Sequence, residues 1–375
     1  METITFDHYH FFVLLGVLQC FVLAGLLIGF KKFRKKANIA LGVALLTTGF
    51  AGIGHVFFHT GITEVYPILT YLPIYNGFLI VLGLYYFVIF LLNPTYQFRT
   101  KDYWLMSPVI LQYIINLAIF VWQIIQPSFN DNHRNTFFDY VYWVELIVSI
   151  FQVGLSIFIQ LKLYNYHRQL LNNYADIEGK SLQWLSIFNI IIIGVSIFSI
   201  YLKIYNILYD EILWIFRFIW IIQIMLLYAL GFIIILKRDV FEIPNFDKKE
   251  SDIPPKSILS SKTDEHYQKL LQLIEKEKLY QDAQLNMDLL AEKTNLSNSY
   301  LSKIINQKEG KNFYDFINSY RVKEVKARLN HADYAHYSIL GIALESGFKS
   351  KSTFNVVFKK MTGMTPSAYK KSLSS

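Results

Sequence analysis

The chain contains a single cysteine, Cys20, inside its first apolar run. One cysteine excludes an intramolecular disulfide and a cysteine-based metal site, so Cys20 is expected to be a small buried side chain. The sequence also lacks a P-loop, an HExxH pair and a GxSxG turn, which are common signatures of enzymes. Met1–His10 carries no lysine or arginine before the apolar run, which argues against a secretory signal peptide. We therefore expect a protein that is not an enzyme and uses no cofactor or metal ion.

Charged residues are also scarce before residue 239, and apolar runs recur throughout that region. Each run is about 20 residues long, enough to cross a hydrocarbon core roughly 30 Å thick. The pattern predicts seven membrane spans: Phe11–Phe30, Asn38–Phe58, Ile68–Leu92, Tyr103–Ile125, Asp139–Gln160, Leu182–Tyr205 and Ile212–Leu236.

Basic residues of the connecting loops gather on one side of these spans. The loops after the first, third, fifth and seventh spans carry Lys31, Lys32, Arg34, Lys35, Lys36, Arg99, Lys101, Lys162, Arg168, Lys180, Lys237 and Arg238. The N-terminus and the other loops carry only Arg134. Positive charge marks the cytoplasmic side, so we expect the N-terminus outside and the C-terminal region in the cytoplasm.

Ionisable and amide side chains within the spans are the candidates for a ligand site, because burying them in lipid is costly. They are His55, His59, Asn76, Glu145, Lys203 and Arg217. One reading gathers them in a pocket open to the outside. The other is a Glu145–Arg217 pair that only fixes helix packing, while the histidines and Lys203 reach towards the interface. Asn116 is expected to form interhelical hydrogen bonds.

Residues 239–263 combine proline with mixed charge, which predicts a flexible linker. From residue 264 a helical pattern returns, with Tyr267, Leu270 and Ile274 on one face. This helix could cap the following domain or join two chains, which leaves a homodimer open.

Two helix-turn-helix units are predicted in series, at about 287–306 and 339–362. The predicted helices are Met287–Thr294, Asn298–Asn306, Phe313–Leu329, Ile339–Ser346 and Lys351–Thr362. Ser297 and Ser350 precede the second helix of each unit as N-caps. Gly347 stands where the turn of the second unit needs a left-handed backbone.

The outward faces of the second helices carry small polar and basic side chains, which suit contacts to bases and phosphates. The candidate DNA contacts are Ser299, Ser302, Lys303, Lys351, Ser352, Asn355 and Lys359. Residues 286–375 contain 14 Lys/Arg against 7 Asp/Glu, so the domain also attracts phosphate without regard to sequence.

This C-terminal region resembles the AraC/XylS-type DNA-binding domain of bacterial transcription regulators. The matching positions are Leu289, Leu290, Ala291, Leu296, Ser297, Tyr300, Leu301, Ser302, Phe316, Ile317, Tyr320, Arg321, Val322, Ile339, Ile342, Ala343, Gly347, Phe348, Ser352, Phe354, Phe358, Lys359, Gly363, Thr365 and Pro366. The resemblance implies that one monomer places two recognition helices in successive segments of the major groove. The chain departs from the family at Gly341, where an acidic residue is usual; glycine there costs about 1 kcal/mol of helix stability.

The expected fold is all-α: a seven-helix transmembrane bundle (residues 1–238), a linker (239–263) and a double helix-turn-helix domain (264–375). The expected function is a sequence-specific transcription regulator anchored in the bacterial cytoplasmic membrane. Its expected partners are double-stranded DNA, the lipid bilayer and an external or membrane-borne small-molecule signal. The alternative is a membrane receptor or transporter whose helix-turn-helix module contacts protein.

Overall fold

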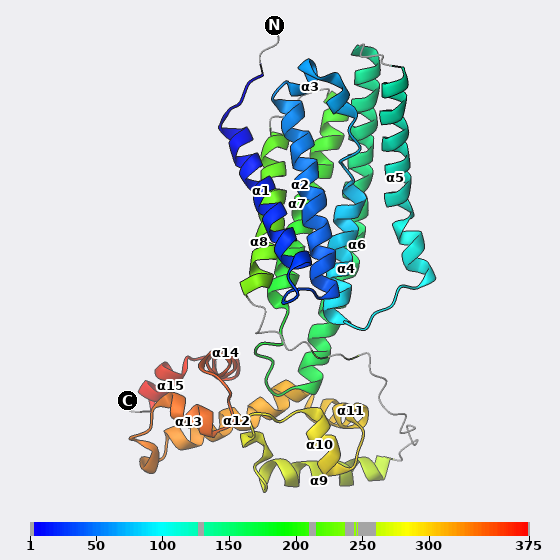
Figure 1. The fold of residues 1–375 in the computed structure, drawn as a ribbon. Helices are drawn as coiled ribbons and strands as arrows, with labels where there is room; N and C mark the ends of the chain where they lie inside the picture. The colour runs from blue at the N-terminus through cyan, green and yellow to red at the C-terminus, as the bar shows by residue number, and fades with distance from the viewer. Residues whose placement is uncertain are drawn as a thin grey trace. The chain divides into compact units, whose positions relative to one another are not determined.

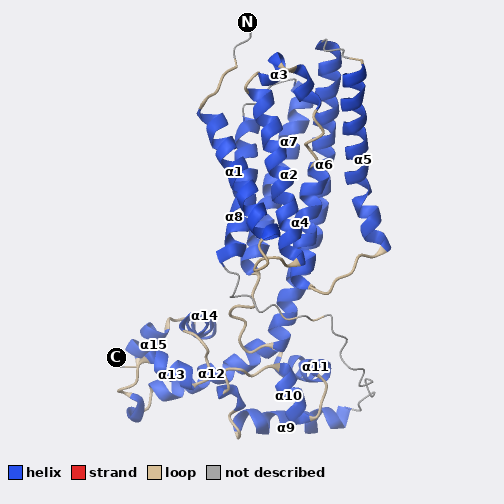
Figure 2. Cartoon of the chain, viewed as in Figure 1, coloured by secondary structure: helices blue, strands red, loops and turns tan. Residues whose placement is uncertain are grey.

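The computed structural model describes residues 4–126, 131–209, 215–236, 244, 246 and 260–373, with the backbone alone for 131–135, 215–217 and 260–262. Every regular element in these ranges is helical (Figure 2). Within them, extended backbone pairs only at one isolated bridge, between Tyr174 and Asn286. The all-α prediction is therefore confirmed. The chain divides into two compact units, one of Met1–Leu163 with Gln183–Asn245 and one of Tyr164–Leu182 with Phe246–Ser375.

The first unit is a bundle of long helices that run side by side (Figure 1). Its elements are α1 (His8–Gly29), α2 (Lys36–His59), α3 (Ile62–Val65), the 3-10 helix η1 (Pro67–Tyr71), α4 (Gly77–Leu92), α5 (Thr100–Ile125), α6 (Asp131–Asn173), α7 (Gln183–Tyr209) and α8 (Ile215–Leu236). Within the described residues six of these helices, α1, α2, α5, α6, α7 and α8, are long and apolar enough to cross a membrane.

Helix α5 has an inverted distribution of polar and apolar side chains. Its buried residues are Asp102, Gln112, Asn116 and Gln123. Its exposed side chains include Trp104, Ile110, Leu111, Ile114, Leu117, Trp122 and Ile125. A helix on the surface of a water-soluble protein has the opposite arrangement, with its apolar stripe facing the core. The outer face of α5 therefore suits an apolar surrounding.

The predicted third span, Ile68–Leu92, is not one continuous helix. The chain forms η1, leaves helical geometry around Pro73 and re-enters a helix only at α4, whose 16 residues extend about 24 Å. Proline supplies no backbone amide, so a helix cannot continue through it without losing a hydrogen bond. Asn76 restarts the helix: its Oδ1 accepts from the amide of Leu79 at 3.0 Å, and its Nδ2 donates to the carbonyl of Val109 at 3.0 Å.

Helix α6 is much longer than the predicted span Asp139–Gln160, because it continues to Asn173. The division between the two compact units falls inside it, after Leu163. Residues 164–182 therefore belong to the second unit. The sequence had assigned them to the membrane bundle, which was predicted to span residues 1–238.

The second unit contains the helix-turn-helix pairs. Its elements are α9 (Ser260–Glu275), η2 (Leu279–Gln281), α10 (Met287–Thr294), α11 (Asn298–Glu309), α12 (Phe313–Leu329), η3 (Ala332–Tyr334), α13 (Ile339–Glu345), α14 (Lys351–Thr362) and α15 (Pro366–Ser372). The predicted bounds of α10, α12 and α14 are confirmed, α11 continues three residues beyond its predicted end, and α13 forms despite Gly341.

Two hydrophobic cores hold this unit together, and α12 contributes to both. Phe316 and Ile317 of α12 pack in the core of the first helix-turn-helix, while Val322 and Val325 pack in the core of the second. Leu270 and Ile274 of α9 are fully buried in the first core. Helix α9 thus covers the domain of its own chain.

Candidate nucleic-acid interface and bundle cavity

Both helix-turn-helix units have the turn and cap that the sequence predicts. In the first, Asn295 adopts a left-handed backbone with φ 59°, and the hydroxyl of Ser297 accepts from the amide of Tyr300 at 3.3 Å. In the second, Gly347 has φ +98°, and the hydroxyl of Ser350 accepts from the amide of Thr353 at 3.2 Å. These caps satisfy amides at the helix starts and fix the directions of α11 and α14.

Gly347 is also a point of close approach between two backbones. A Cβ at this position would lie 2.3 Å from the carbonyl oxygen of Tyr280 and 3.0 Å from Nε of Arg321. The turn between α13 and α14 contacts the backbone of η2 so closely that no side chain fits between them. The glycine is required for contact as well as for conformation.

The second helix of each unit presents its predicted residues on an exposed face. In α11, Ser299 and Lys303 are exposed and Ser302 is half-buried, while Leu301, Ile304 and Ile305 are fully buried. In α14, Phe354, Val357 and Phe358 are buried, and all four predicted contacts, Lys351, Ser352, Asn355 and Lys359, are exposed. The structure therefore brings the predicted contacts of each unit together on one outward helix face.

Sequence reasoning missed Val356 on the same face of α14. Its side chain is 68% exposed, one turn beyond Ser352 and next to Asn355. An exposed branched apolar group there matches the chemistry of a thymine methyl in the major groove. The signal was available, because the helical spacing of the core residues Phe354, Val357 and Phe358 leaves position 356 on the outward side.

Sequence reasoning also missed Glu178, whose carboxylate lies at the start of α14. It accepts hydrogen bonds from the hydroxyls of Ser350, of Ser352 at 2.9 Å and of Thr353 at 3.0 Å. The bond from Ser350 contributes most to lowering the pKa of Glu178, and the other two hydroxyls and nearby Lys349 lower it further, against the effect of burial. An anion is therefore already bound at one predicted DNA contact.

Arg321 connects three separate segments at the centre of the unit. Its side chain is fully buried. Its Nε donates to the carbonyl of Tyr280 at 2.7 Å, its Nη2 to that of Asp282 at 2.8 Å, and its Nη1 to Ala175 and to Oδ1 of Asn318, both at 3.3 Å. Burial lowers the pKa of Arg321 to about 10, so the guanidinium stays charged at neutral pH.

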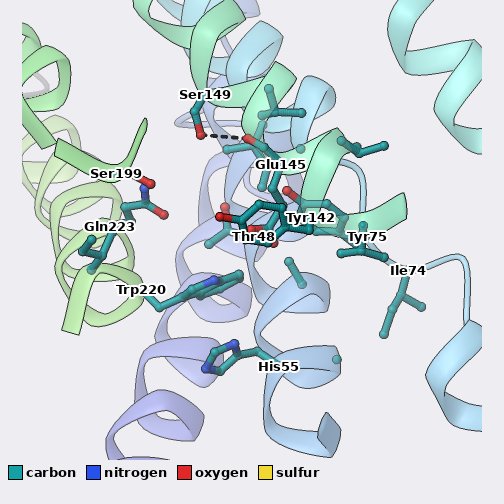
Figure 3. Close-up of a pocket in the computed structure, with 18 of the residues that line it drawn as sticks. Thr48, His55, Ile74, Tyr75, Tyr142, Glu145, Ser149, Ser199, Trp220 and Gln223 are labelled. Carbon is teal, nitrogen blue, oxygen red and sulfur yellow. Dashed lines mark hydrogen bonds between the residues drawn. The ribbon is translucent and has the colours of Figure 1, made fainter. Parts of the chain in front are cut away.

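The first unit contains a cavity of about 490 Å³ between its helices (Figure 3). Four of the six predicted pocket residues line it: His55, His59, Glu145 and Lys203. Asn76 is not among the lining residues and serves as the N-cap of α4. Arg217 lies in α8, and its side chain is outside the described residues.

An ion pair between α6 and α7 lies in the wall of this cavity. Nζ of Lys203 is 3.4 Å from Oε2 of Glu145 and donates to the hydroxyl of Ser149 at 3.2 Å. The backbone carbonyl of Lys203 accepts a hydrogen bond from Tyr142. Among the described side chains Glu145 thus pairs with Lys203, while the side chain of Arg217, the partner in one of the two sequence readings, lies outside them.

The two histidines stand in an aromatic cluster at the cavity. The ring of His55 stacks on Trp220 with centroids 4.8 Å apart, and the rings of His55 and His59 are 4.3 Å apart. Tyr9 forms a hydrogen bond with His55. Within the described residues no group of three metal-binding side chains gathers.

Asn116 forms interhelical hydrogen bonds as predicted. Its Nδ2 donates to the carbonyl of Tyr75 at 3.0 Å, and its Oδ1 accepts from Tyr140 at 2.9 Å. It therefore links α5 both to α6 and to the non-helical stretch before α4.

Comparison with known proteins bears on the second unit. Residues 290–372 match the helix-turn-helix domain family. An uncharacterised HTH-type transcriptional regulator of Staphylococcus aureus (strain COL) is 35% identical over 86 residues, which are 23% of this chain and 11% of that protein. The melibiose operon regulatory protein of Escherichia coli (strain K12) is 34% identical over 90 residues, 24% of this chain and 29% of that protein.

A solved structure of a protein of unknown function from Listeria innocua covers 28% of this chain and 94% of its own, with 28% identity and a TM-score of 0.25. The chain spans only about a tenth to a third of the curated relatives it matches. These matches show that residues 290–372 are similar to helix-turn-helix domains, including those of proteins named as transcription regulators.

Proposed function

We propose that this chain is a membrane-anchored transcription regulator that binds specific DNA sequences and senses a small molecule in its bundle cavity. The observation that carries the proposal is the joining, in one chain, of two capped helix-turn-helix units to helices whose outward faces are apolar. Helix-turn-helix units bind the major groove of DNA. Helices with apolar outward faces are suited to a lipid bilayer.

Membrane insertion is supported by α5, which exposes Trp, Ile and Leu while burying Asp102 and Gln112. In water, exposing that apolar face would be unfavourable by roughly 25 cal/mol for each Å². The basic residues of the loops support a cytoplasmic position for the second unit, where DNA is accessible. The regulator then acts on DNA that approaches the membrane.

The lining of the cavity suits a ligand that has an apolar body and one polar end. Most of its lining is apolar, whereas the Glu145–Lys203 pair and the two histidines offer charge and hydrogen bonds at defined points. A volume of about 490 Å³ fits a small organic molecule.

Chromatin immunoprecipitation of the full chain from its own cells tests the DNA-binding part. We expect recovered fragments to share a sequence motif with two elements about one helical turn apart, since one monomer carries two reading helices. Recovery of fragments with no common motif would favour the alternative, in which the helix-turn-helix module contacts protein.

Replacing Lys351 with alanine is expected to weaken binding to that motif by about tenfold, because a lysine that reads a base contributes roughly 1–3 kcal/mol of discrimination. The measurement is a gel shift with the purified full chain in detergent, on motif DNA and on scrambled DNA. Lys276→Ala, which removes the same charge from an exposed site after α9, is the matched control. If the two variants bound the motif with equal affinity, Lys351 would not be a residue that contacts its bases.

Filling the cavity is expected to abolish ligand binding. A panel of small amphiphilic compounds is screened for stabilisation of the purified chain, and a ligand at 100 times its Kd adds about 2.7 kcal/mol. Hits should stabilise the wild type and the control Ile197→Phe, which adds the ring on the exposed face of α7, but not Ser199→Phe, which adds it inside the cavity. Hits that stabilise Ser199→Phe equally would place the ligand elsewhere.

A further inference from the structure

The connection between α6 and α7, residues Tyr174–Leu182, is packed into the DNA-binding unit as if it were part of that domain. Ala175 is fully buried in the core of the first helix-turn-helix, and Ile177 packs against the core of the second. Leu171, in the last turns of α6, joins the second core as well. We call residues Tyr174–Leu182 the α6–α7 connector. The connector packs against the cores of both helix-turn-helix units.

Hydrogen bonds fix the position of this connector. The amide of Ala175 donates to the carbonyl of Leu285 at 3.4 Å, beside the bridge between Tyr174 and Asn286. The carbonyl of Ala175 accepts from Nδ2 of Asn318 at 3.1 Å and from Nη1 of Arg321 at 3.3 Å. Both donors are fully buried, so removing the connector would leave them to find other partners.

The middle of the connector lies at the start of α14, among the predicted DNA contacts. Glu178 accepts hydrogen bonds from the N-cap Ser350, from Ser352 and from Thr353 at the start of α14. A DNA phosphate at this helix start would need the same hydroxyls and would meet the negative charge of Glu178. Carboxylate and phosphate therefore exclude each other at this position.

We propose that the α6–α7 connector is an autoinhibitory ligand of the second helix-turn-helix, and that a DNA phosphate must displace Glu178 before α14 can enter the major groove. The proposal rests on the DNA-binding function proposed above. It assigns to Glu178 the role of a phosphate mimic carried by the same chain. Binding to DNA is then weaker than the reading surface alone would give, by the free energy of docking the connector.

The covalent chain links this contact to the cavity. The connector begins where α6 ends and leads into α7 at Gln183. Glu145 of α6 and Lys203 of α7 form the ion pair in the cavity wall. A ligand that separates this pair acts on the two helices that carry the connector, which is how a signal in the bundle would change the docking of Glu178.

The test compares DNA binding by the full chain in detergent with that of Glu178→Gln and Glu178→Ala. The probe is a duplex selected from a random-sequence library by the chains themselves. We expect both variants to bind about tenfold more tightly than the wild type, within the usual range of coupling between sites. Glu265→Gln removes the same charge from an exposed position on α9 and should stay within about twofold of the wild type.

A second measurement needs no substitution. Hydrogen exchange of the wild-type chain should show residues 174–178 losing protection when the duplex is added, while α14 gains it. Connector amides that stay protected in the complex, or Glu178 variants that bind no better than Glu265→Gln, would overturn autoinhibition and leave the connector a structural part of the domain. Failure of every chain to select any DNA would instead refute the proposed function itself.

Discussion

Alanine at position 347 is expected to destabilise the second helix-turn-helix by roughly 2–6 kcal/mol and to abolish specific DNA binding. Two costs combine. A φ of +98° costs a residue with a side chain roughly 1–3 kcal/mol, and forcing extra volume into a packed contact costs a similar amount. The added Cβ would lie 2.3 Å from the carbonyl oxygen of Tyr280, so the backbones of η2 and of the α13–α14 turn must separate.

Gly363→Ala is the matched control for this prediction. Gly363 also has a positive φ, +75°, but a Cβ there would meet nothing within 4 Å. It should cost only the conformational penalty, roughly 1–2 kcal/mol. Hydrogen exchange of α13 and α14 in the full chain measures both variants. Equal loss of protection would mean that the approach to Tyr280 contributes nothing and that only the left-handed backbone requires glycine.

The helix-turn-helix units could be predicted closely from sequence because their signals are local. Ser297 and Ser350 cap helices within three residues of themselves, and Gly347 marks its own backbone conformation. Helical spacing of Phe354, Val357 and Phe358 separates the core face of α14 from the outward face without reference to any other element.

The break in the third predicted span could not be placed by hydropathy alone. Pro67 and Pro73 lie in a stretch that is apolar enough to look continuous, and the helix restarts only where Asn76 caps it. The amide nitrogen of the same side chain donates to the carbonyl of Val109, a partner 33 residues away that no local pattern reveals. The same side chain therefore looked like a pocket residue from sequence and is a structural one.

Long-range pairing also explains why the connector was not predicted. Ala175 meets Asn318 and Arg321 across separations of 143 and 146 residues, and no periodicity encodes such a contact. A weak signal existed in Asp176 and Glu178, which are acidic residues in a loop that the charge bias places with basic ones. One reading of the sequence put Glu145 and Lys203 in the same pocket, but it could not single out their pairing, since several charged side chains stand in the spans.

Replacement of Arg321 by methionine is expected to cost roughly 3–5 kcal/mol, because the three carbonyls of Ala175, Tyr280 and Asp282 would lose a buried donor. Methionine fills much of the volume, so the loss reports the hydrogen bonds more than a cavity. Arg321→Lys keeps the charge but cannot reach three carbonyls with one ammonium group, so it should fall between the wild type and methionine.

The Arg321→Met substitution should raise hydrogen exchange in two particular segments. Hydrogen exchange of the full chain should rise in η2 and in the α6–α7 connector together, since Arg321 is the group that holds both against α12. Lys323→Met, at an exposed position on the same helix, should stay within about 0.5 kcal/mol of the wild type. If Arg321→Met matched Lys323→Met in stability, the two segments would be held by apolar packing, and the buried guanidinium would have no structural role.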